Sequence, residues 1–322
     1  MTKINHSQSG ENFMRFLITG AAGFLGSSLA NQLVLAGHSV RGVDDLSTGD
    51  PEKLSKEVSF TRGDVNDRPK LWTLLQDIDC VYHLAARVVV PESVLYPREY
   101  NHVNVGGTVT LMEAIRDVGV RRVIFTSSGA IYGNQPNQPV KENAIPYPKS
   151  PYAVSKLAAE YYTHTIGSLW GIETVCLRIF NAYGPHQQLP PTHPPVIPYF
   201  LKQAHENATI VIHGDGSQTR DYLYIDDVVE GMIAAATATS VNRLTINIGS
   251  GRETSVRDLA RMVIEITGKK PEFINNVRND GGPNRMCADI NLAREKLNFY
   301  PRTPLEVGLQ MTYEKDPRIH QS

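Results

Sequence analysis

The chain of 322 residues is 41% hydrophobic, which is enough apolar material for one large core or for two closely joined domains. Its 32 lysines and arginines nearly cancel its 33 aspartates and glutamates, which excludes a strong field favouring nucleic acid or an anionic membrane surface. Any anionic ligand must therefore be held by local groups. No stretch lacks charge for long enough to span a bilayer, so we expect no membrane partner.

The cysteines and histidines indicate the cellular compartment and whether a metal site is present. Cys80, Cys176 and Cys287 are odd in number, far apart and each set in an apolar stretch, which suits a reducing compartment and predicts the cytoplasm. Neither His-x-x-x-His nor Cys-x-x-Cys spacing occurs, so no metal site is predicted. Residues 1–13 are polar and lack the apolar centre of a signal peptide, and we interpret them as a disordered extension.

From Phe16 onward, short apolar runs alternate with helical patterns. After the first run, Leu25, Leu29 and Leu33 recur on one face of a predicted helix. The predicted strands are 16–19, 40–43, 58–61, 80–84, 123–126 and 174–177. Continuous apolar strands joined by helices predict an α/β fold, a doubly wound parallel sheet covered on both faces.

The sequence texture changes after Asn181, because six prolines fall between residues 185 and 198. Such a stretch cannot form a long helix or a central strand, and we interpret it as a loop region on the substrate side. Regular structure returns with a strand at 209–212, a helix from Asp226, a strand at 245–248 and a helix after Ser255. The change predicts a smaller C-terminal domain that binds the substrate.

A glycine-rich loop, Gly20-Ala21-Ala22-Gly23-Phe24-Leu25-Gly26, follows the first predicted strand and opens the first helix. Glycines in this place permit a tight turn and let a pyrophosphate approach the backbone N–H groups of the helix N-terminus. The second strand ends in Asp44-Asp45, at about the 20-residue distance expected of a ribose-binding carboxylate. Asp44 would accept from both ribose hydroxyls and repel a 2′-phosphate, which predicts NAD rather than NADP.

A tyrosine and a lysine begin a later predicted helix. Tyr152 and Lys156 are four residues apart, so they share one helix face about one turn apart. The ammonium is expected to lower the pKa of the phenol, as a general base for an alcohol proton requires. Ser128 ends the fifth strand, at the edge where open α/β sheets bind ligands, and can donate a hydrogen bond to the reacting oxygen.

Together these motifs resemble the extended short-chain dehydrogenase/reductase superfamily and its NAD-dependent epimerase/dehydratase family, with a Rossmann-like fold. The further motifs that carry the resemblance are Asp44 to Gly49, Asp64-Val65, His83-Leu84-Ala85-Ala86, Asn104, Ser127-Ser128 and Tyr132-Gly133. Residues 214–222 and 288–290 are similar to the nucleotide-sugar branch, most closely to UDP-hexose 4-epimerases. The resemblance spans residues 15 to about 310.

The resemblance implies domains and residue roles. An NAD-binding domain would comprise 14–180 plus about 222–250, and a nucleotide-sugar-binding domain about 181–221 plus 251–316. Tyr152, Lys156 and Ser128 would be catalytic, Asp64 and Val65 would contact adenine, and Asn104 would lie near the nicotinamide. The implied cofactor-binding residues are Gly20, Gly23, Phe24, Leu25, Gly26, Asp44, Asp45, Asp64, Val65, Leu84, Ala85, Ala86, Asn104, Ser127, Tyr152 and Lys156.

The implied substrate-binding residues are Ser128, Asn181, Arg220, Arg285 and Met286. The two guanidinium groups match phosphate oxygens, although Arg285 follows a stretch, 280–284, that departs from the family pattern. Met286 falls where epimerases use side-chain size to admit or exclude an N-acetyl group. His186 stands where many relatives place an arginine and could meet the C6 end of the sugar. The prediction is UDP-glucose and UDP-galactose, with UDP-glucuronate and UDP-N-acetylglucosamine left open.

Gly129 and Ala130 indicate which sugar chemistry follows. Relatives that eliminate water carry an Asp-Glu pair here, and neither glycine nor alanine can transfer a proton. Return of the hydride to a transient 4-keto sugar is therefore predicted, which makes the protein a 4-epimerase. The alternatives are a dehydratase of the same family, a reductase or dehydrogenase that releases its product after one hydride transfer, and a non-catalytic dinucleotide-binding regulator.

The resemblance also implies an oligomeric state. In relatives, the helices corresponding to residues 101–118 and 152–168 pair into a four-helix interface between two copies. We therefore expect a homodimer. Its small-molecule partner would be a UDP-hexose.

Overall fold

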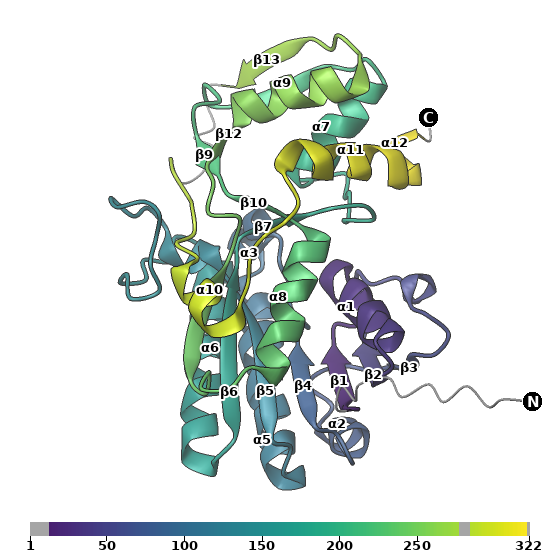
Figure 1. The fold of residues 1–322 in the computed structure, drawn as a ribbon, viewed down its shortest axis with the longest axis vertical. Helices are drawn as coiled ribbons and strands as arrows, with labels where there is room; N and C mark the ends of the chain where they lie inside the picture. Colours follow the sequence, from purple (N-terminus) through teal and green to yellow (C-terminus); the bar gives the residue numbers. More distant parts are fainter. Residues whose placement is uncertain (1–12, 277–283, 321–322) are drawn as a thin grey trace, which may run out of the picture.

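The computed structural model describes residues 13–276 and 284–320, so the predicted N-terminal extension lies outside the described residues except for Phe13. At the centre is a parallel sheet of seven strands in the order β11-β6-β5-β4-β1-β2-β3 (Figure 1). The strands are β1 (Arg15–Thr19), β2 (Ser39–Asp44), β3 (Ser59–Arg62), β4 (Cys80–His83), β5 (Arg122–Ser128), β6 (Glu173–Ile179) and β11 (Leu244–Ile248). The doubly wound α/β prediction is confirmed. The strand order reverses between β1 and β4, where such sheets open a crevice at their carboxyl ends.

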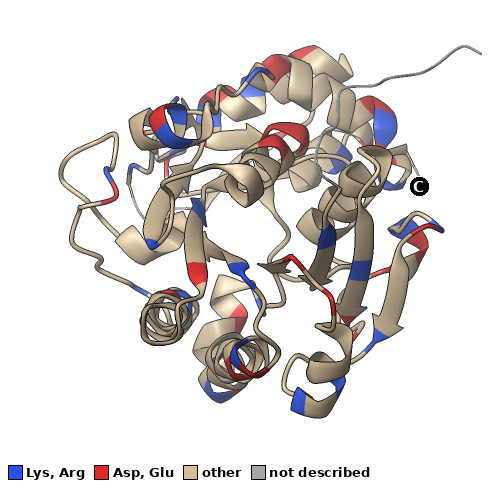
Figure 2. Ribbon diagram, turned by 60° about the horizontal axis from the view of Figure 1, so that its bottom comes forward, with Lys and Arg blue, Asp and Glu red and all other residues tan. Residues whose placement is uncertain are grey.

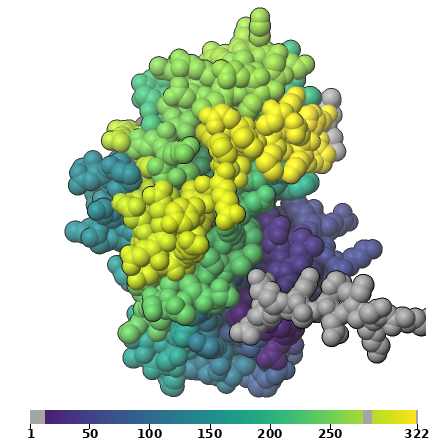
Figure 3. All heavy atoms as spheres, viewed as in Figure 1, coloured from purple at the N-terminus to yellow at the C-terminus, as the bar shows by residue number. Residues whose placement is uncertain are grey.

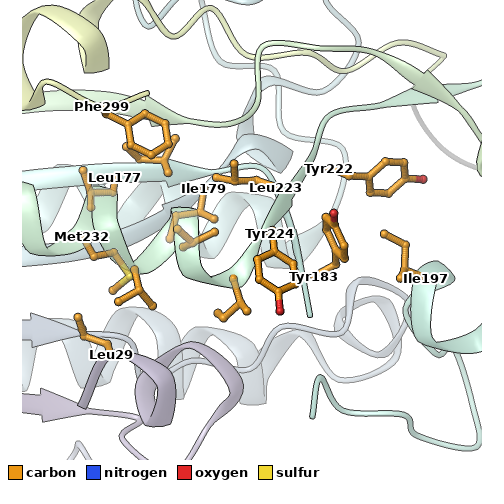
Figure 4. Packing of buried hydrophobic residues seen from close by; sticks show 14 of the residues in the cluster. Leu29, Leu177, Ile179, Tyr183, Ile197, Tyr222, Leu223, Tyr224, Met232 and Phe299 are labelled. Atoms are coloured by element: carbon orange, nitrogen blue, oxygen red, sulfur yellow. The ribbon is translucent and has the colours of Figure 1, made fainter. Parts of the chain in front are cut away.

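Helices cover both faces of this sheet. On one face, α1 (Phe24–Leu35) packs beside α8 (Ile225–Thr237), and on the other, α5 (Gly107–Val118) lies between α2 (Arg68–Leu74) and α6 (Pro151–Trp170) (Figure 1). Successive strand residues point to opposite faces, so the apolar strands feed two separate cores. Figure 4 shows the first core, where Leu29, Leu177 and Met232 approach one another from α1, β6 and α8.

Short helices connect the strands. They are η1 (Pro51–Lys53), α3 (Val90–Leu95), α4 (Pro97–Tyr100), η2 (Asn101–Gly106) and η3 (Gly129–Tyr132). The segment predicted as one helix from residue 101 to 118 begins with η2, a π-helical turn, and continues directly into α5. Two glycines, Gly106 and Gly107, lie at that junction.

Beyond the carboxyl ends of the sheet, the described residues form three small strand pairs and four helices. β7 (Asn181–Tyr183) pairs with β10 (Tyr222–Tyr224), β8 (Ile210–His213) with β13 (Phe273–Asn276), and β9 (Thr219–Arg220) with β12 (Thr254–Ser255). The helices are α7 (Val196–His205), α9 (Val256–Thr267), α11 (Leu305–Lys315) and α12 (Pro317–His320). The last of the crowded prolines, Pro198, lies in the first turn of α7, where a missing N–H costs no helical hydrogen bond.

The C-terminal part of the chain crosses the predicted domain boundary. α10 (Asn291–Leu297) contacts α8 and β11, so this part of the predicted substrate domain returns to the sheet (Figure 3). The physical reason is burial, because Leu297 and Phe299 join the core that α1 and α8 share. The division into two domains otherwise stays a prediction.

Charge and membrane features agree with the balanced composition. Lysines, arginines, aspartates and glutamates are interspersed over the ribbon in Figure 2. Within the described residues, no helix combines the length and the apolar character needed to cross a membrane. Cys80, Cys176 and Cys287 are all buried free thiols.

Candidate active site

A cavity of about 820 Å³ opens at the carboxyl ends of β1, β2, β4, β5 and β6. It is lined by all but two of the residues predicted to bind cofactor or substrate. The predicted residues that line it are Gly20, Gly23, Phe24, Leu25, Gly26, Asp44, Asp45, Asp64, Val65, Leu84, Ala85, Ala86, Ser127, Ser128, Tyr152, Lys156, Asn181, Arg220 and Met286. Asn104 and Arg285 are not among the described residues that line it.

The glycine loop is shaped for close approach of a ligand to the backbone. Gly20 has a φ of +71°, and a Cβ atom there would lie 2.7 Å from the backbone nitrogen of Ala85. A Cβ at Gly26 would collide with the backbone oxygen of Gly20. Gly23 caps α1 and has no side chain to accept from the first-turn N–H groups. This end of α1 therefore fits the pyrophosphate of a dinucleotide.

Asp44 lies at the end of β2 and is buried. Its Oδ2 accepts from the Ala22 backbone nitrogen at 3.0 Å and its Oδ1 from that of Leu46 at 2.9 Å. Burial raises the pKa of Asp44, and these two backbone bonds oppose that rise. Each carboxylate oxygen has a second lone pair, so the same group can also accept from ribose hydroxyls. Asp45, by contrast, is exposed and accepts from the Ser47 nitrogen at 2.8 Å.

His83 supports the loop at the end of β4, a role that the sequence motif did not reveal. Its Nδ1 lies 2.7 Å from the Thr19 hydroxyl and its Nε2 lies 2.9 Å from the Thr108 hydroxyl. Burial lowers the pKa of His83 to about 3, so the ring is neutral at pH 7. Because the Ala85 nitrogen donates to Thr19 Oγ1 at 3.2 Å, this chain of bonds holds the loop that faces the glycines.

Asn104 is buried and is not among the described residues that line the cavity, and its predicted place beside the nicotinamide stays a prediction. Its amide oxygen accepts from the Arg87 nitrogen at 2.8 Å, and its amide nitrogen donates to the Arg87 oxygen and to the Ser155 hydroxyl. The side chain thus fixes Arg87, which does line the cavity. A buried amide must satisfy both of its ends, and here protein groups satisfy them.

Tyr152, Lys156 and Ser128 meet at the bottom of the cavity. α6 begins at Pro151 because Ser150 accepts from the Ala153 nitrogen at 3.1 Å, which places Tyr152 in the first turn. Tyr152 is 8% exposed, and the Ser128 hydroxyl lies close enough to lower the pKa of its phenol. Lys156 is 4% exposed, with its Nζ 4.4 Å from the centroid of the Phe125 ring.

The pKa pattern of this group differs from the prediction. Burial raises the pKa of Tyr152, and the Ser128 hydrogen bond is what opposes the rise, so the lowering expected from the lysine is wrong for this state. The physical reason is that Lys156 is itself desolvated, and burial lowers its pKa to about 8. At pH 7 the phenol is therefore neutral in this state, while Lys156 is still mostly charged.

The two predicted arginines differ. Arg220 is half-buried, lines the cavity and donates to the Thr219 oxygen at 2.7 Å, and burial lowers its pKa. Arg285 is 55% exposed and binds Glu253 through Nη2 and Oε1 at 2.9 Å. Its contact with substrate phosphate stays a prediction, since in this state its guanidinium binds a carboxylate.

The remaining predicted substrate-binding residues, one polar and one apolar, also line the cavity. Asn181 donates to the Asp221 oxygen at 2.9 Å, and Met286 packs into an apolar cluster with Phe180 and Ile131. His186 is exposed and is not among the described lining residues, whereas His193 is. Gln187 and Gln188, which belong to the loop predicted to meet the C6 end of the sugar, line the cavity, and Arg87 and Phe180 are lining residues that the sequence did not single out.

Comparison with known proteins places this site in a family. Residues 16–249 match the NAD dependent epimerase/dehydratase family. The chain belongs to that family. The UDP-glucose 4-epimerase of Mycolicibacterium smegmatis is 38% identical over 94% of this chain and 98% of its own.

Two solved structures share the fold of this family member. The UDP-glucose 4-epimerase of Thermotoga maritima with UDP-glucose has a TM-score of 0.90 and 34% identity, over 96% of this chain and 100% of that one. A Bacillus cereus UDP-glucuronic acid 4-epimerase variant with a fluorinated substrate analogue and NAD has a TM-score of 0.87 and 34% identity, over 95% and 100%. NAD is accordingly the cofactor of this epimerase/dehydratase family member.

Asp44 is expected to make this family member prefer NAD to NADP. A like charge about 4 Å from a carboxylate costs about 4 kcal/mol at an effective dielectric constant near 20, so NAD should bind at least about tenfold more tightly. Asp44→Asn should reduce the ratio of the NADP to the NAD dissociation constant. Asp45→Asn, which changes an exposed neighbour, should leave that ratio unchanged. Fluorescence titration of protein freed of nucleotide measures both ratios. Equal affinity of the wild type for the two cofactors would contradict this role.

Proposed function

We propose that the protein is a UDP-glucose 4-epimerase, which interconverts UDP-glucose and UDP-galactose. The observation that carries the proposal is the buried Tyr152 phenol, which lies with Ser128 inside a cavity that also contains the glycine loop and Arg220. The lining residues that follow Ser128 are Gly129 and Ala130, which have no proton to give or take. Elimination of water lacks its acid and base at these positions.

The mechanism begins at the sugar 4-hydroxyl. In its phenolate form, Tyr152 takes the proton of that hydroxyl and becomes a neutral phenol, and Ser128 donates a hydrogen bond to the same oxygen. NAD, when bound, accepts the hydride from carbon 4 and later returns it. The residues that would hold NAD are the glycine loop, Asp44 and the segment Leu84–Ala86, with Lys156 beside the reacting atoms.

Inversion requires the 4-keto sugar to present its opposite face. Rotation about the diphosphate linkage achieves this, provided that the nucleotide stays anchored while the sugar turns. Arg220 supplies the anchor for the diphosphate, and Asn181 lies on the same wall. Tyr152 then returns its proton to the oxygen at carbon 4, which restores both the enzyme and the alcohol.

The charges of the cavity support a neutral hexose. Among its described lining residues, the lysine and arginine side chains are Arg87, Lys156 and Arg220. Arg87 pairs with Glu92 at 3.2 Å, Lys156 belongs to the catalytic group and Arg220 would bind the diphosphate. A uronate carboxylate would therefore find no further fixed cation on this described wall. Met286 is a bulky lining residue of the same cavity, which supports a hydroxyl rather than an N-acetyl group at C2.

The test is an activity panel. Purified protein is incubated with UDP-glucose, UDP-N-acetylglucosamine or UDP-glucuronate, without added reductant, and the 4-epimers are separated by chromatography. UDP-galactose should form from UDP-glucose at the highest kcat/KM. Faster conversion of the uronate or the N-acetyl sugar would replace the proposed substrate, and a 4-keto-6-deoxy product would defeat epimerisation. Net NAD reduction matched to product would indicate a dehydrogenase.

We also propose a homodimer in the cytoplasm. The outer face of α6 carries Val154, Tyr161 and Tyr162, which are 52%, 59% and 47% exposed, and a second copy packed there would cover them. The buried free thiols suit a reducing compartment. Sedimentation velocity measures the oligomeric state, and a monomer at micromolar concentration would count against the dimer.

A further inference from the structure

A buried ion pair lies directly behind the catalytic residues. Arg178 of β6 binds Glu160 of α6 with 2.6 Å between Nη2 and Oε1, and the two side chains are 6% and 3% exposed. Desolvating two charges costs several kcal/mol, and well-packed apolar residues are often as stable in such a place. The pair therefore calls for a role other than stability.

Glu160 and Arg178 also form hydrogen bonds with other residues around the active site. The Ser127 hydroxyl donates to Glu160 Oε2 at 2.7 Å, and Arg178 donates to the Tyr132 hydroxyl at 2.8 Å and to the Glu142 oxygen at 3.0 Å. The Tyr132 hydroxyl donates in turn to Asn247 Oδ1 at 2.7 Å. These bonds connect α6, β5, β6, η3 and β11. If any one of these elements moved as a rigid body, at least one hydrogen bond of the network would break.

The network and the catalytic group share one helix face. Tyr152, Lys156 and Glu160 follow one another at intervals of four residues along α6. α6 is thus attached to the end of β5 through the bond from Ser127 to Glu160, two turns of the helix beyond Tyr152. Ser127 was predicted to bind cofactor, and its hydroxyl proton is instead committed to Glu160.

We propose that Glu160 and Arg178 are positioning residues of the epimerisation. Their ion pair holds α6 against β6, and the bond from Ser127 to Glu160 holds it against β5, so that the Tyr152 phenol meets Ser128 and the substrate oxygen. The Glu160 carboxylate also stabilises the charged form of Lys156. The inference rests on the proposed function, because it concerns the same proton transfer.

The surroundings of Lys156 make the second effect measurable. On its own helix, Lys156 faces Tyr152 and Glu160; from the sheet it meets the Phe125 ring, the Cys176 thiol and the neutral His83 ring. Burial lowers the pKa of Lys156, whereas the Glu160 charge raises it. Removal of that charge must lower the lysine pKa further. Activity that requires the charged form of Lys156 would then decline at a lower pH than in the wild type as the pH is raised.

The experiment compares variants that remove the charge of Glu160 with a control variant at a second ion pair, which joins β5 and β6. Glu160→Gln keeps the shape of the side chain and removes its charge. The double variant Glu160→Gln with Arg178→Gln avoids an unpaired buried arginine if the single variant does not fold. Glu173→Gln is the control, because Glu173 binds Arg122 at 2.6 Å and joins the same two strands at their opposite ends.

The readouts are kcat, KM and the pH profile, with thermal unfolding to confirm folding. We expect the Glu160 variants to lose about tenfold or more in kcat with KM within about threefold, and their alkaline limb to move down by about one pH unit. Glu173→Gln should change only stability. Wild-type profiles in both Glu160 variants, or the same shift in Glu173→Gln, would overturn the proposal.

A second measurement is independent of turnover. The ionisation of Lys156 is followed by NMR in protein carrying isotope-labelled lysine, with Lys156→Gln to assign the signal. Its pKa should fall in Glu160→Gln and in the double variant, and an unchanged value would refute the electrostatic part. A wild type that does not interconvert UDP-sugars would defeat the proposed function, while this measurement would still decide the role of Glu160.

Discussion

Tyr152→Phe is expected to lower kcat by about 10²- to 10⁴-fold, the usual contribution of one general acid–base group. The phenyl ring keeps the packing of Tyr152, including its edge-on contact with Tyr100 at 6.4 Å between centroids. Only the hydroxyl that Ser128 contacts is lost. KM for UDP-glucose should therefore change much less than kcat. Initial rates of UDP-galactose formation measure both constants.

A tyrosine on the same helix provides the control. Tyr161 is 59% exposed on α6, so Tyr161→Phe removes a phenol hydroxyl without touching the cavity. Its kcat should equal that of the wild type. Full activity of Tyr152→Phe would show that another group takes the 4-hydroxyl proton, and with it the proposed mechanism would fail. Loss of bound NAD in that variant would instead indicate a cofactor-binding role.

The strands and the first glycine loop could be predicted because local patterns determine them. The continuous apolar runs of β1, β4, β5 and β6 need no long-range information, since a strand buried on both faces requires apolar side chains throughout. The loop Gly20–Gly26 combines tight backbone contacts with a helix start, and no other residue type fits those contacts. The position of Asp44 then follows from the length of one helix and one strand.

Two of the predicted ligand-binding residues have partners distant in the sequence. Arg285 was predicted to bind phosphate from its guanidinium and its place in the family pattern, and in the structure it pairs with Glu253, which lies 32 residues earlier. Asn104 contacts Arg87 and Ser155 through its amide. Neither partner could be inferred from spacing. Only the fold shows which polar side chains are satisfied by the protein and which face the cavity.

The pKa of Tyr152 illustrates the same limit for chemistry. A spacing of four residues correctly placed the phenol and the ammonium on one helix face. It could not reveal that both groups are buried, and burial outweighs their mutual effect. The Glu160–Arg178 pair was missed for a related reason, because a glutamate inside a helix and an arginine inside a strand have no local pattern that pairs them.

Arg220→Met is expected to raise KM for UDP-glucose, and Kd for UDP, by about 10- to 100-fold, the effect of losing charge-assisted hydrogen bonds worth about 1.5–3 kcal/mol. Burial lowers the pKa of Arg220, and an anionic diphosphate beside it would favour its charged form. A guanidinium has five donors, so its bond to the Thr219 oxygen is compatible with a bidentate phosphate contact. The methionine keeps the length and apolar stem of the side chain.

Arg285→Met is the matched comparison. The same change is made at an exposed arginine that binds Glu253, so Kd for UDP should stay within about twofold of the wild type, as exposed ion pairs contribute little. Calorimetric titration of UDP into the NAD-bound protein measures both variants. A large loss in Arg285→Met with none in Arg220→Met would reverse the assignment and place the diphosphate on the other side of Met286. Equal losses would mean that the sugar nucleotide spans both arginines, with the Glu253 pair opening on binding.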